Sequence, residues 1–594
     1  MIEPRIYRAA FVPALLAVVL AMFSLESRPR PVPQGLAADV LFDGDQAADQ
    51  ARQIAADHPD RAAGRPGDRA VGEQVAAAFR AGGFTVESQP FDHDGDELVN
   101  VIGRRAGRML EQVVVIAARD AAGAPDAAGS AADTAALMEL ARVFEGRPSR
   151  KSLVLASVDG ATLGDLGVRR LLDEIDGPDV VDAVVVISGL GAPPREPPRI
   201  VPWSNDTTRA GIGLQRTVTA SLRAEGQASP SPASPFGQLA RLAFPLGIGG
   251  QGLLIAEGYD AVRLSGAGEL AEGTADQPVD AERLGALGRA TLRTVTALDQ
   301  GAAPERGPRT YVVLAGQVVP GWALALLAAT LILPVLAAGI DAFARARRRK
   351  AHVGPWLLWI GLGIVPFLVG YGAAVLASLV GATPDPPPSP VAPGLFPLDG
   401  AALATLAVVA LSVAASWGLL RHFAGPTARH LDDAPGSGAG VAVALALGAA
   451  GLALLAIDPF AALLAVPALH LWMLAALIDP PPARRVRLAL VAGGLVLPLL
   501  LVAYQLSVLG LDPLGGAWYL VLLVLGGQVG LASVAVVALF AAVLAEIAAI
   551  LRHQGGRTSP RGGTGPGTGP VSTRGPLSYA GPGSLGGTDS ALRR

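Results

Sequence analysis

Long apolar runs constrain the fold of this chain more than any other feature. The first covers residues 9–25. Seven more follow in the second half of the chain, at about residues 318–340, 354–380, 400–420, 438–457, 459–478, 487–508 and 518–550. Each is close to or longer than the roughly 20 residues that a helix needs to cross about 30 Å of hydrocarbon. With 51% hydrophobic and 16% charged residues, the composition excludes an ordinary soluble enzyme and a disordered chain. We therefore predict a polytopic α-helical membrane domain, with about eight spans in the chain.

The charges of the loops predict the orientation in the cell membrane. In the second half of the chain, arginine and lysine occur in alternate loops, at residues 345–350, 421–429 and 484–487 and after Arg552. Because positively charged loops stay in the cytoplasm, these loops and both termini are expected inside. The large segment between the first two apolar runs would then be extracytoplasmic.

These boundaries predict four parts. They are a signal-anchor helix (1–26), an extracytoplasmic domain (47–300), a seven-span membrane domain (317–551) and a disordered cytoplasmic tail (555–594). The tail is rich in Gly, Ser, Thr and Pro and has too few apolar residues to fold. A further Pro-rich segment, Gly381–Pro397, is expected to be an extended extracytoplasmic loop. The first run could instead be a cleaved signal peptide, but no A-x-A-like site directly follows it.

The extracytoplasmic domain alternates short apolar strands with helical patterns. Strands are predicted at 113–117, 152–157, 183–187 and 261–264, and helices at 72–81, 133–144, 167–174 and 281–296. Uniformly apolar strands separated by amphipathic helices indicate an α/β fold whose sheet is covered on both faces. Sites in such sheets form at the carboxyl ends of the strands, so the informative residues are expected there.

Five motifs in this domain follow the order of a known family. They are RAAGRPGDRAVGEQVAAAFRAGGFTVESQPF (Arg61–Phe91), NVIG (Asn100–Gly103), DTAALMELARVF (Asp133–Phe144), RKSLVLASVDGATLGDLGVRRLL (Arg150–Leu172) and EGYDAVRLSGAGE (Glu257–Glu269). In this order they resemble the di-zinc aminopeptidases, peptidase family M-28, over less than half of the chain. The resemblance implies an aminopeptidase-like three-layer α/β sandwich. The layout, with one anchor, a large outer domain and seven further spans, also looks like the lipid-handling subunit of GPI transamidase.

The metal ligands implied by this resemblance do not carry over. Two zinc ions would need histidine and carboxylate ligands and a glutamate as general base. The aligned positions hold Arg119 (first histidine), Gly129 (bridging aspartate), Ala161 and Thr162 (base and ligand glutamates), Ser188 (aspartate after the next strand) and Gln251 (last histidine). A shifted alignment would leave Asp126 or Asp133 near the second metal. It cannot restore the histidines, because the domain has only His58 and His93, both before the ligand strands. We therefore expect these positions to form a pocket with no metal and no catalytic residue.

Other polar clusters in the domain have ordinary structural explanations. The segment Asp92–Asp96 contains possible calcium or zinc ligands, but Asp and Gly are also common turn formers, so a turn is favoured. Gly247–Gly252 fits a dinucleotide-binding pattern, yet no clear strand precedes it. Ser188 and Ser265 follow strands, but no well-placed histidine could activate either as a nucleophile.

Few polar residues occur within the predicted spans. His470 is the clearest functional candidate, with Tyr504, Gln505 and Gln528 in later spans. Ionisable groups at membrane depth usually face a bundle interior and are often functional. A single neutral imidazole could equally well hydrogen-bond a neighbouring helix.

Three classes of function fit these observations. The favoured one is a non-catalytic binding or assembly protein whose metallopeptidase-like domain has lost its zinc ligands. The second is an active membrane-bound aminopeptidase with altered ligands, for which zinc would be the cofactor. The third is a lipid-handling or transport domain with an accessory outer domain.

The partners expected from the sequence are membrane lipids, other membrane proteins, or a peptide or anionic ligand at the outer domain. Arg119 has the planar fork that binds a carboxylate or phosphate, but it could instead form a structural ion pair with Asp120, Asp126 or Asp159. A formal net charge of −3 excludes a strongly basic nucleic-acid binder.

Overall fold

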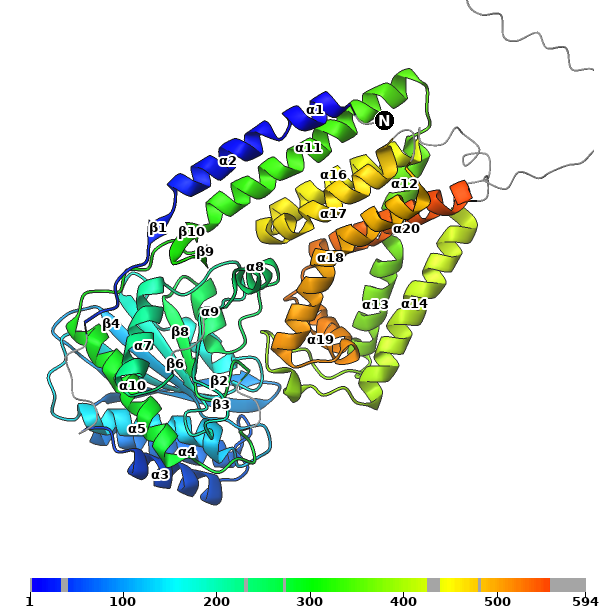
Figure 1. Ribbon diagram of the computed structural model, residues 1–594. Coiled ribbons are helices and arrows are strands. Elements are labelled where there is room, and N and C mark those ends of the chain that lie inside the picture. Colours follow the sequence, from blue (N-terminus) through cyan, green and yellow to red (C-terminus); the bar gives the residue numbers. More distant parts are fainter. Residues whose placement is uncertain are drawn as a thin grey trace, which may run out of the picture. The chain divides into compact units, whose positions relative to one another are not determined.

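The central sheet of the α/β domain has seven strands in the order β2-β3-β5-β4-β6-β8-β7 in a computed structural model of the chain (Figure 1). The strands are β2 (Thr85–His93), β3 (Asp96–Arg105), β4 (Gln112–Ala118), β5 (Ser152–Val158), β6 (Val181–Ser188), β7 (Arg199–Val201) and β8 (Ala261–Ser265). Strands β5, β4, β6 and β8 are parallel, whereas β2, β3 and β7 are antiparallel to their neighbours. The four strands predicted from apolar runs are the parallel ones. Their carboxyl ends meet at one edge of the sheet.

The structure describes residues 3–33, 41–228, 233–270, 274–424, 438–478 and 482–555. The predicted cytoplasmic tail therefore lies outside the described residues, apart from Gly555. The chain up to Leu551 forms one compact unit.

Helices complete a three-layer α/β sandwich. They are α3 (Gly44–Asp57), α4 (Pro66–Ala81), α5 (Ala132–Phe144), α6 (Leu166–Leu172), α7 (Ile212–Ala224), α8 (Pro235–Ala243), α9 (Gly250–Ala256) and α10 (Ala281–Gln300). Helix α4 packs on β3, α5 packs on β4 and β5, and α9 packs on β6 and β8. Amphipathic helices on a sheet of uniformly apolar strands are the arrangement that the sequence pattern predicts.

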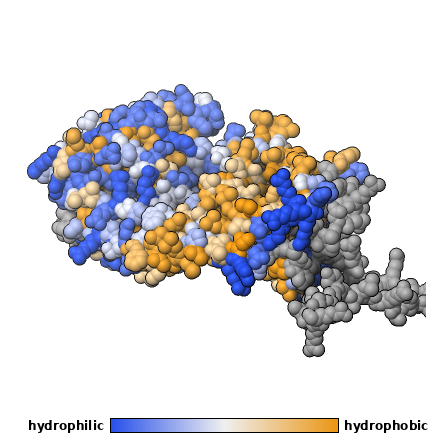
Figure 2. Space-filling view, turned by 90° about the horizontal axis from the view of Figure 1, so that it is seen from above, coloured by the Kyte–Doolittle hydropathy of each residue, from blue (hydrophilic) through white to orange (hydrophobic). Residues whose placement is uncertain are grey.

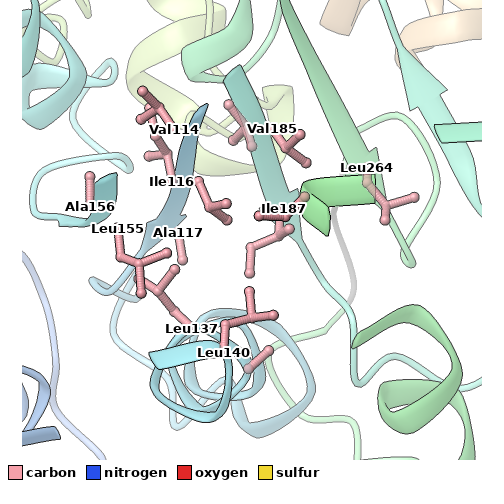
Figure 3. Close-up of a cluster of buried hydrophobic side chains, with 14 of the residues drawn as sticks. Val114, Ile116, Ala117, Leu137, Leu140, Leu155, Ala156, Val185, Ile187 and Leu264 are labelled. Atoms are coloured by element: carbon pink, nitrogen blue, oxygen red, sulfur yellow. The ribbon is translucent and has the colours of Figure 1, made fainter. Parts of the chain in front are cut away.

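The core of the domain lies between the parallel strands and α5. Leu137 and Leu140 of α5 lie on the side of the sheet that carries Ala117 of β4 and Ile187 of β6, and all four side chains are almost fully buried (Figure 3). Both faces of the central strands are covered, which explains why apolar residues occupy consecutive positions in them rather than every second one.

Eight helical segments among the described residues are long and apolar enough to cross a membrane. They are α1 with α2 (Pro4–Ala9 and Val12–Phe23), α11 (Gly321–Arg348), α12 with α13 (Gly354–Leu362 and Val365–Leu379), α14 (Gly400–Ala424), α16 (Ala439–Ile457), α17 (Pro459–Leu477), α18 (Arg484–Leu509) and α20 (Leu531–Gly555). Figure 2 shows hydrophobic surface residues gathered over the membrane helices, whereas the surface of the α/β domain is mainly hydrophilic. The chain has the features of a multi-pass membrane protein.

The last predicted span, 518–550, is wrong in extent, because two helices occupy this region. Helix α19 (Pro513–Leu525) is separated from α20 by a break that contains Gly526, Gly527 and Gly530. Gly527 has a φ of +79°, which residues with a side chain rarely adopt. With 13 residues, α19 is too short to cross about 30 Å of hydrocarbon.

A small antiparallel sheet at the start of α11 was not expected from the sequence. Strands β9 (Tyr311–Leu314) and β10 (Gln317–Pro320) form a hairpin, and β1 (Glu26–Ser27) pairs with β10. The predicted span at 318–340 therefore begins in a strand, and α11 starts at Gly321. The sheet thus pairs the segment after α2 with the segment before α11.

Candidate functional site

Arg119 is the centre of a buried polar cluster at the carboxyl edge of the sheet. It directly follows β4, and its Nε and Nη2 donate to the two carboxylate oxygens of Asp68 at 2.9 and 2.5 Å. Nη2 also donates to the carbonyl of Val99 at 2.8 Å and lies 3.6 Å from an Asp159 oxygen. The side chains of Arg119, Asp68 and Asp159 are 0% exposed. A guanidinium paired in this two-point geometry is neutralised inside the protein.

The main partner of Arg119 was not among the residues expected from the sequence. The ion pair with Asp159 was one of the alternatives, but the two-point partner is Asp68, in the first turn of α4. Acidic residues are common in the first turn of any helix, where they favour the helix dipole, so its sequence position did not distinguish Asp68. Burial alone would lower the pKa of Arg119, but the ion pair and hydrogen bond with Asp68 outweigh it and raise the pKa above the ordinary value.

Asp120 connects the end of β4 to the loop after β5. Its carboxylate accepts hydrogen bonds from the backbone N–H groups of Ala161 and Thr162, both at 2.9 Å, and from the Thr162 hydroxyl at 2.7 Å. Burial raises the pKa of Asp120. Ala161 and Thr162, the two positions that the motif alignment places at the family's glutamates, thus hold the carboxylate next to Arg119.

A carboxylate lies beside Gly129, but it comes from Asp126. A Cβ atom added at Gly129 would lie 2.3 Å from Oδ1 of Asp126 and 2.6 Å from Oγ1 of Thr274. Asp126 has a φ of +41°, and its Oδ2 accepts from the backbone N–H of Ser130 at 2.7 Å. The adjacent Arg61 is fully buried and donates to the Ser130 hydroxyl at 3.0 Å. The carboxylate nearest to Gly129 is therefore that of Asp126, one of the two residues named by the shifted alignment. A cation, Arg61, lies next to it.

Asp133, the other residue of the shifted alignment, is bonded to the backbone at the end of β6. Its carboxylate accepts from the N–H groups of Gly189 and Leu190 at 2.7 and 2.9 Å. Burial raises the pKa of Asp133 to about 7. Ser188, the aligned ligand position, is half-buried and pairs in register with Ser265 of β8.

Gln251 lies in the first turn of α9 and is fully buried. Its Nε2 donates to the Ile248 carbonyl at 2.8 Å, while Oε1 has no hydrogen-bond partner among the described residues. Arg263 of β8 is close, since a Cβ at Gly249 would lie 2.9 Å from Gln251 Oε1 and 3.4 Å from Arg263 Cζ. Burial raises the pKa of Asp165 to about 7, and the charge of Arg263 opposes this shift.

The aligned residues thus stand at or beside the carboxyl ends of β4, β5, β6 and β8, within a network of arginines and aspartates. No group of three or more His, Cys, Asp or Glu residues that could hold a metal ion occurs in the described part of the chain. A cavity of about 700 Å³ lies elsewhere, between α6, α9 and residues 388–390 and 526–528, and none of the aligned residues lines it.

The two other motifs of the domain have the expected structural roles. Residues 92–96 form the tip of the β2–β3 hairpin, with Asp94 and Gly95 at φ +52° and +87°. Positive φ at both central residues is the geometry of a two-residue hairpin turn. Gly247–Gly252 leads from a loop into α9 and does not follow a strand, so it lacks the context of a dinucleotide site.

His470 makes packing contacts between membrane helices. Its Nδ1 is 2.7 Å from the Tyr7 hydroxyl, and its Nε2 is 2.9 Å from the carbonyl of Leu331. Phe11 stacks on the ring, with centroids 5.4 Å apart. Both ring nitrogens therefore have partners, which supports the structural interpretation of this residue.

The later polar residues contact segments outside the membrane helices. Gln505 Nε2 donates to the carbonyls of Ala240 and Phe244 at the end of α8, at 3.0 and 3.2 Å. Tyr504 packs edge-on against Phe236 of the same helix. Gln528 Nε2 donates to the Pro387 carbonyl at 2.9 Å. These contacts join the membrane helices to the α/β domain and to the Pro-rich loop.

Comparisons with known proteins give similarities to solved structures only. No family model and no curated protein matches the chain. The zinc aminopeptidase BSAP from Bacillus subtilis is 12% identical, with a TM-score of 0.37, covering 46% of this chain and 98% of that one. A glutaminyl cyclase from Porphyromonas gingivalis is 18% identical, with a TM-score of 0.35, covering 43% and 98%. A Zn-dependent exopeptidase from Parabacteroides distasonis is 15% identical, with a TM-score of 0.34, covering 45% and 99%.

Proposed function

We propose that this protein is a membrane-anchored, non-catalytic member of the aminopeptidase-like proteins, with a role in binding or assembly at the extracytoplasmic face. The observation that carries the proposal is the ion pair of Arg119 and Asp68. In the motif alignment Arg119 takes the place of the first zinc-binding histidine, and a guanidinium cannot ligate a metal. The carboxylate next to it, Asp68, is already engaged by the guanidinium.

The remaining aligned positions support the same conclusion. Ala161 offers no ligand atom, and the Thr162 hydroxyl donates to Asp120. Two of the nearby carboxylates are already engaged, Asp68 by Arg119 and Asp133 by the backbone N–H groups of Gly189 and Leu190. Charged groups removed from water need such partners, so moving these carboxylates onto zinc would leave buried charges unpaired.

Binding or assembly is supported by the way the domain is joined to the membrane helices. Helix α8 of the domain is contacted by Gln505 through a hydrogen bond and by the ring of Tyr504. The Pro-rich loop accepts a hydrogen bond from Gln528. Layout and fold, which resemble those of the lipid-handling subunit of GPI transamidase, favour a role within a larger membrane assembly. GPI chemistry is not part of the proposal.

Metal analysis and hydrolysis of the purified full-length protein test this function together. We expect zinc far below one equivalent per chain after dialysis against micromolar zinc, and no release of amino acids from unblocked peptides. A zinc aminopeptidase of known activity, analysed in parallel, controls for an assay that fails to detect zinc. Stoichiometric zinc with chelator-sensitive hydrolysis in the unaltered protein would overturn the proposal in favour of an active aminopeptidase with altered ligands.

A further inference from the structure

The Pro-rich loop (Gly381–Pro397), which connects α13 and α14, is bonded at one side to α19 and to the α19–α20 break. The Tyr519 hydroxyl donates to the Val391 carbonyl at 2.7 Å, and Trp518 Nε1 donates to the Phe396 carbonyl at 3.2 Å. Gln528, within the break, donates to the Pro387 carbonyl at 2.9 Å. Tyr519 and Trp518 are buried, so these are interior contacts and not surface ones.

The opposite side of the same loop contacts the α/β domain. The Ser389 hydroxyl donates to the Gly164 carbonyl at 2.5 Å, and the Ser389 side chain is buried. Arg169 of α6 donates to the Pro388 carbonyl. Gly164 has a φ of +93°, and a Cβ atom there would lie 2.7 Å from Cδ of Pro388. The two segments therefore approach so closely that only glycine fits at position 164.

The contacted segment, residues 160–166, is the one that completes the candidate site. Its Ala161 and Thr162 donate to Asp120, the neighbour of Arg119. Its Asp165 is buried beside Arg263. A displacement of this segment would therefore break hydrogen bonds to the end of β4.

We propose that the Pro-rich loop is a strap that couples the α19–α20 break to residues 160–166, so that a movement of these helices changes the geometry of the site edge. The chain of contacts runs from Gln528 through Pro387–Ser389 to Gly164, and then from Thr162 to Asp120. Each link is a hydrogen bond or a close backbone approach, so the strap transmits displacement without large rearrangement. This inference goes beyond the proposed function, because it holds whether or not the site edge binds a metal or a ligand.

Hydrogen–deuterium exchange of the full-length protein in lipid nanodiscs tests the coupling. The informative peptide covers residues 160–166. Variants Ser389→Ala and Gly164→Ala alter the contact directly, while Gln528→Ala and Tyr519→Phe alter the attachment of the loop to the break and to α19. We expect both groups to raise exchange at 160–166 by about three- to tenfold, the factor for losing about one net hydrogen bond.

Two matched controls separate the strap from general loosening. Gly95→Ala places a side chain at a similar positive φ (+87°) with nothing within 4 Å, so it should leave exchange at 160–166 unchanged. Gln505→Ala removes a different contact between the membrane helices and the α/β domain, at α8. The coupling is overturned if Gln528→Ala and Tyr519→Phe leave the 160–166 peptide unchanged, or if Gln505→Ala raises its exchange equally. Zinc content plays no part in this readout, so its outcome is independent of the proposed function.

Discussion

At the scale of single residues, the buried ion pairs of Arg119 determine the chemistry of the carboxyl edge of the sheet. Arg119 lies where a ligand histidine is expected from the motif alignment, yet its charge is balanced inside the domain by Asp68 and Asp159. Burying an unpaired guanidinium would cost several kcal/mol, so the arginine and the aspartates depend on one another. Arg119 therefore contributes to the stability of the buried cluster.

The first prediction concerns this pair. Asp68→Ala should destabilise the α/β domain by about 3–5 kcal/mol, because it leaves the Arg119 guanidinium buried without its main partner. The double variant Asp68→Leu, Arg119→Met should recover most of this loss, since both charges are gone. A cysteine introduced at buried Ala136 in this cysteine-free chain reports unfolding through its rate of thiol labelling in urea. A loss below about 1 kcal/mol in Asp68→Ala would show that the pair does not support the fold.

The second prediction concerns pH and Asp165. Burial raises its pKa from 3.8 to about 7 in the folded protein, so folding favours the protonated form. The corresponding stability is fully present below about pH 4 and is lost as pH rises through 7. Asp165→Asn should therefore stabilise the protein at pH 8 and change little at pH 4; asparagine also tolerates the φ of +55°.

The measurement is the thermal midpoint of the detergent-solubilised protein at both pH values. Asp173→Asn, at an exposed position after α6, is the control and should shift neither midpoint. If Asp165→Asn and the unaltered protein have the same thermal midpoint at both pH values, the carboxyl of Asp165 is not buried in its protonated form.

Secondary-structure elements differ in how far the sequence predicts them. Strands β4, β5, β6 and β8 are rich in consecutive apolar residues, because both of their faces are buried, and the sequence predicts them for this reason. Strands β1 and β7 have two and three residues and depend on pairing with distant segments. The same holds for the docking of α8 on Gln505, because no local pattern indicates a contact between residues 240 and 505.

The third prediction concerns the break between α19 and α20. The sequence predicted one long span here, although Gly526, Gly527 and Gly530 interrupt it. Gly527→Ala should destabilise the protein by about 1 kcal/mol, because alanine is strained at a φ of +79° while space around it is open. Gly530→Ala, with equally open space and no positive φ, is the control. Equal thermal midpoints for both variants would show that the left-handed backbone at Gly527 is not required.

At the scale of the whole molecule, the sequence predicts the two kinds of domain but not how they are joined. Apolar runs and strand patterns depend on local composition, and the structure has the predicted α/β sandwich and apolar helices. The motif order assigns the positions of the candidate site, which stay a prediction, but it could not assign the partners of its residues. Asp68 and Arg119 are separated by 51 positions in the sequence, and Ser389 and Gly164 by 225. Such pairings are set by tertiary packing, to which a single sequence gives no direct access.

The last prediction concerns orientation, which follows from loop charge. Single cysteines at exposed Asp94, in the β2–β3 hairpin, and at exposed Asp385, in the Pro-rich loop, should react with an impermeant maleimide on intact cells. A cysteine at exposed Arg347, at the end of α11, should react only after permeabilisation, because its arginine cluster is expected in the cytoplasm. The contact between Ser389 and Gly164 adds a structural constraint, since it requires the Pro-rich loop and the α/β domain to share one side. Labelling of the Arg347→Cys variant on intact cells would contradict the orientation, and opposite behaviour of the Asp94→Cys and Asp385→Cys variants would contradict the strap as well.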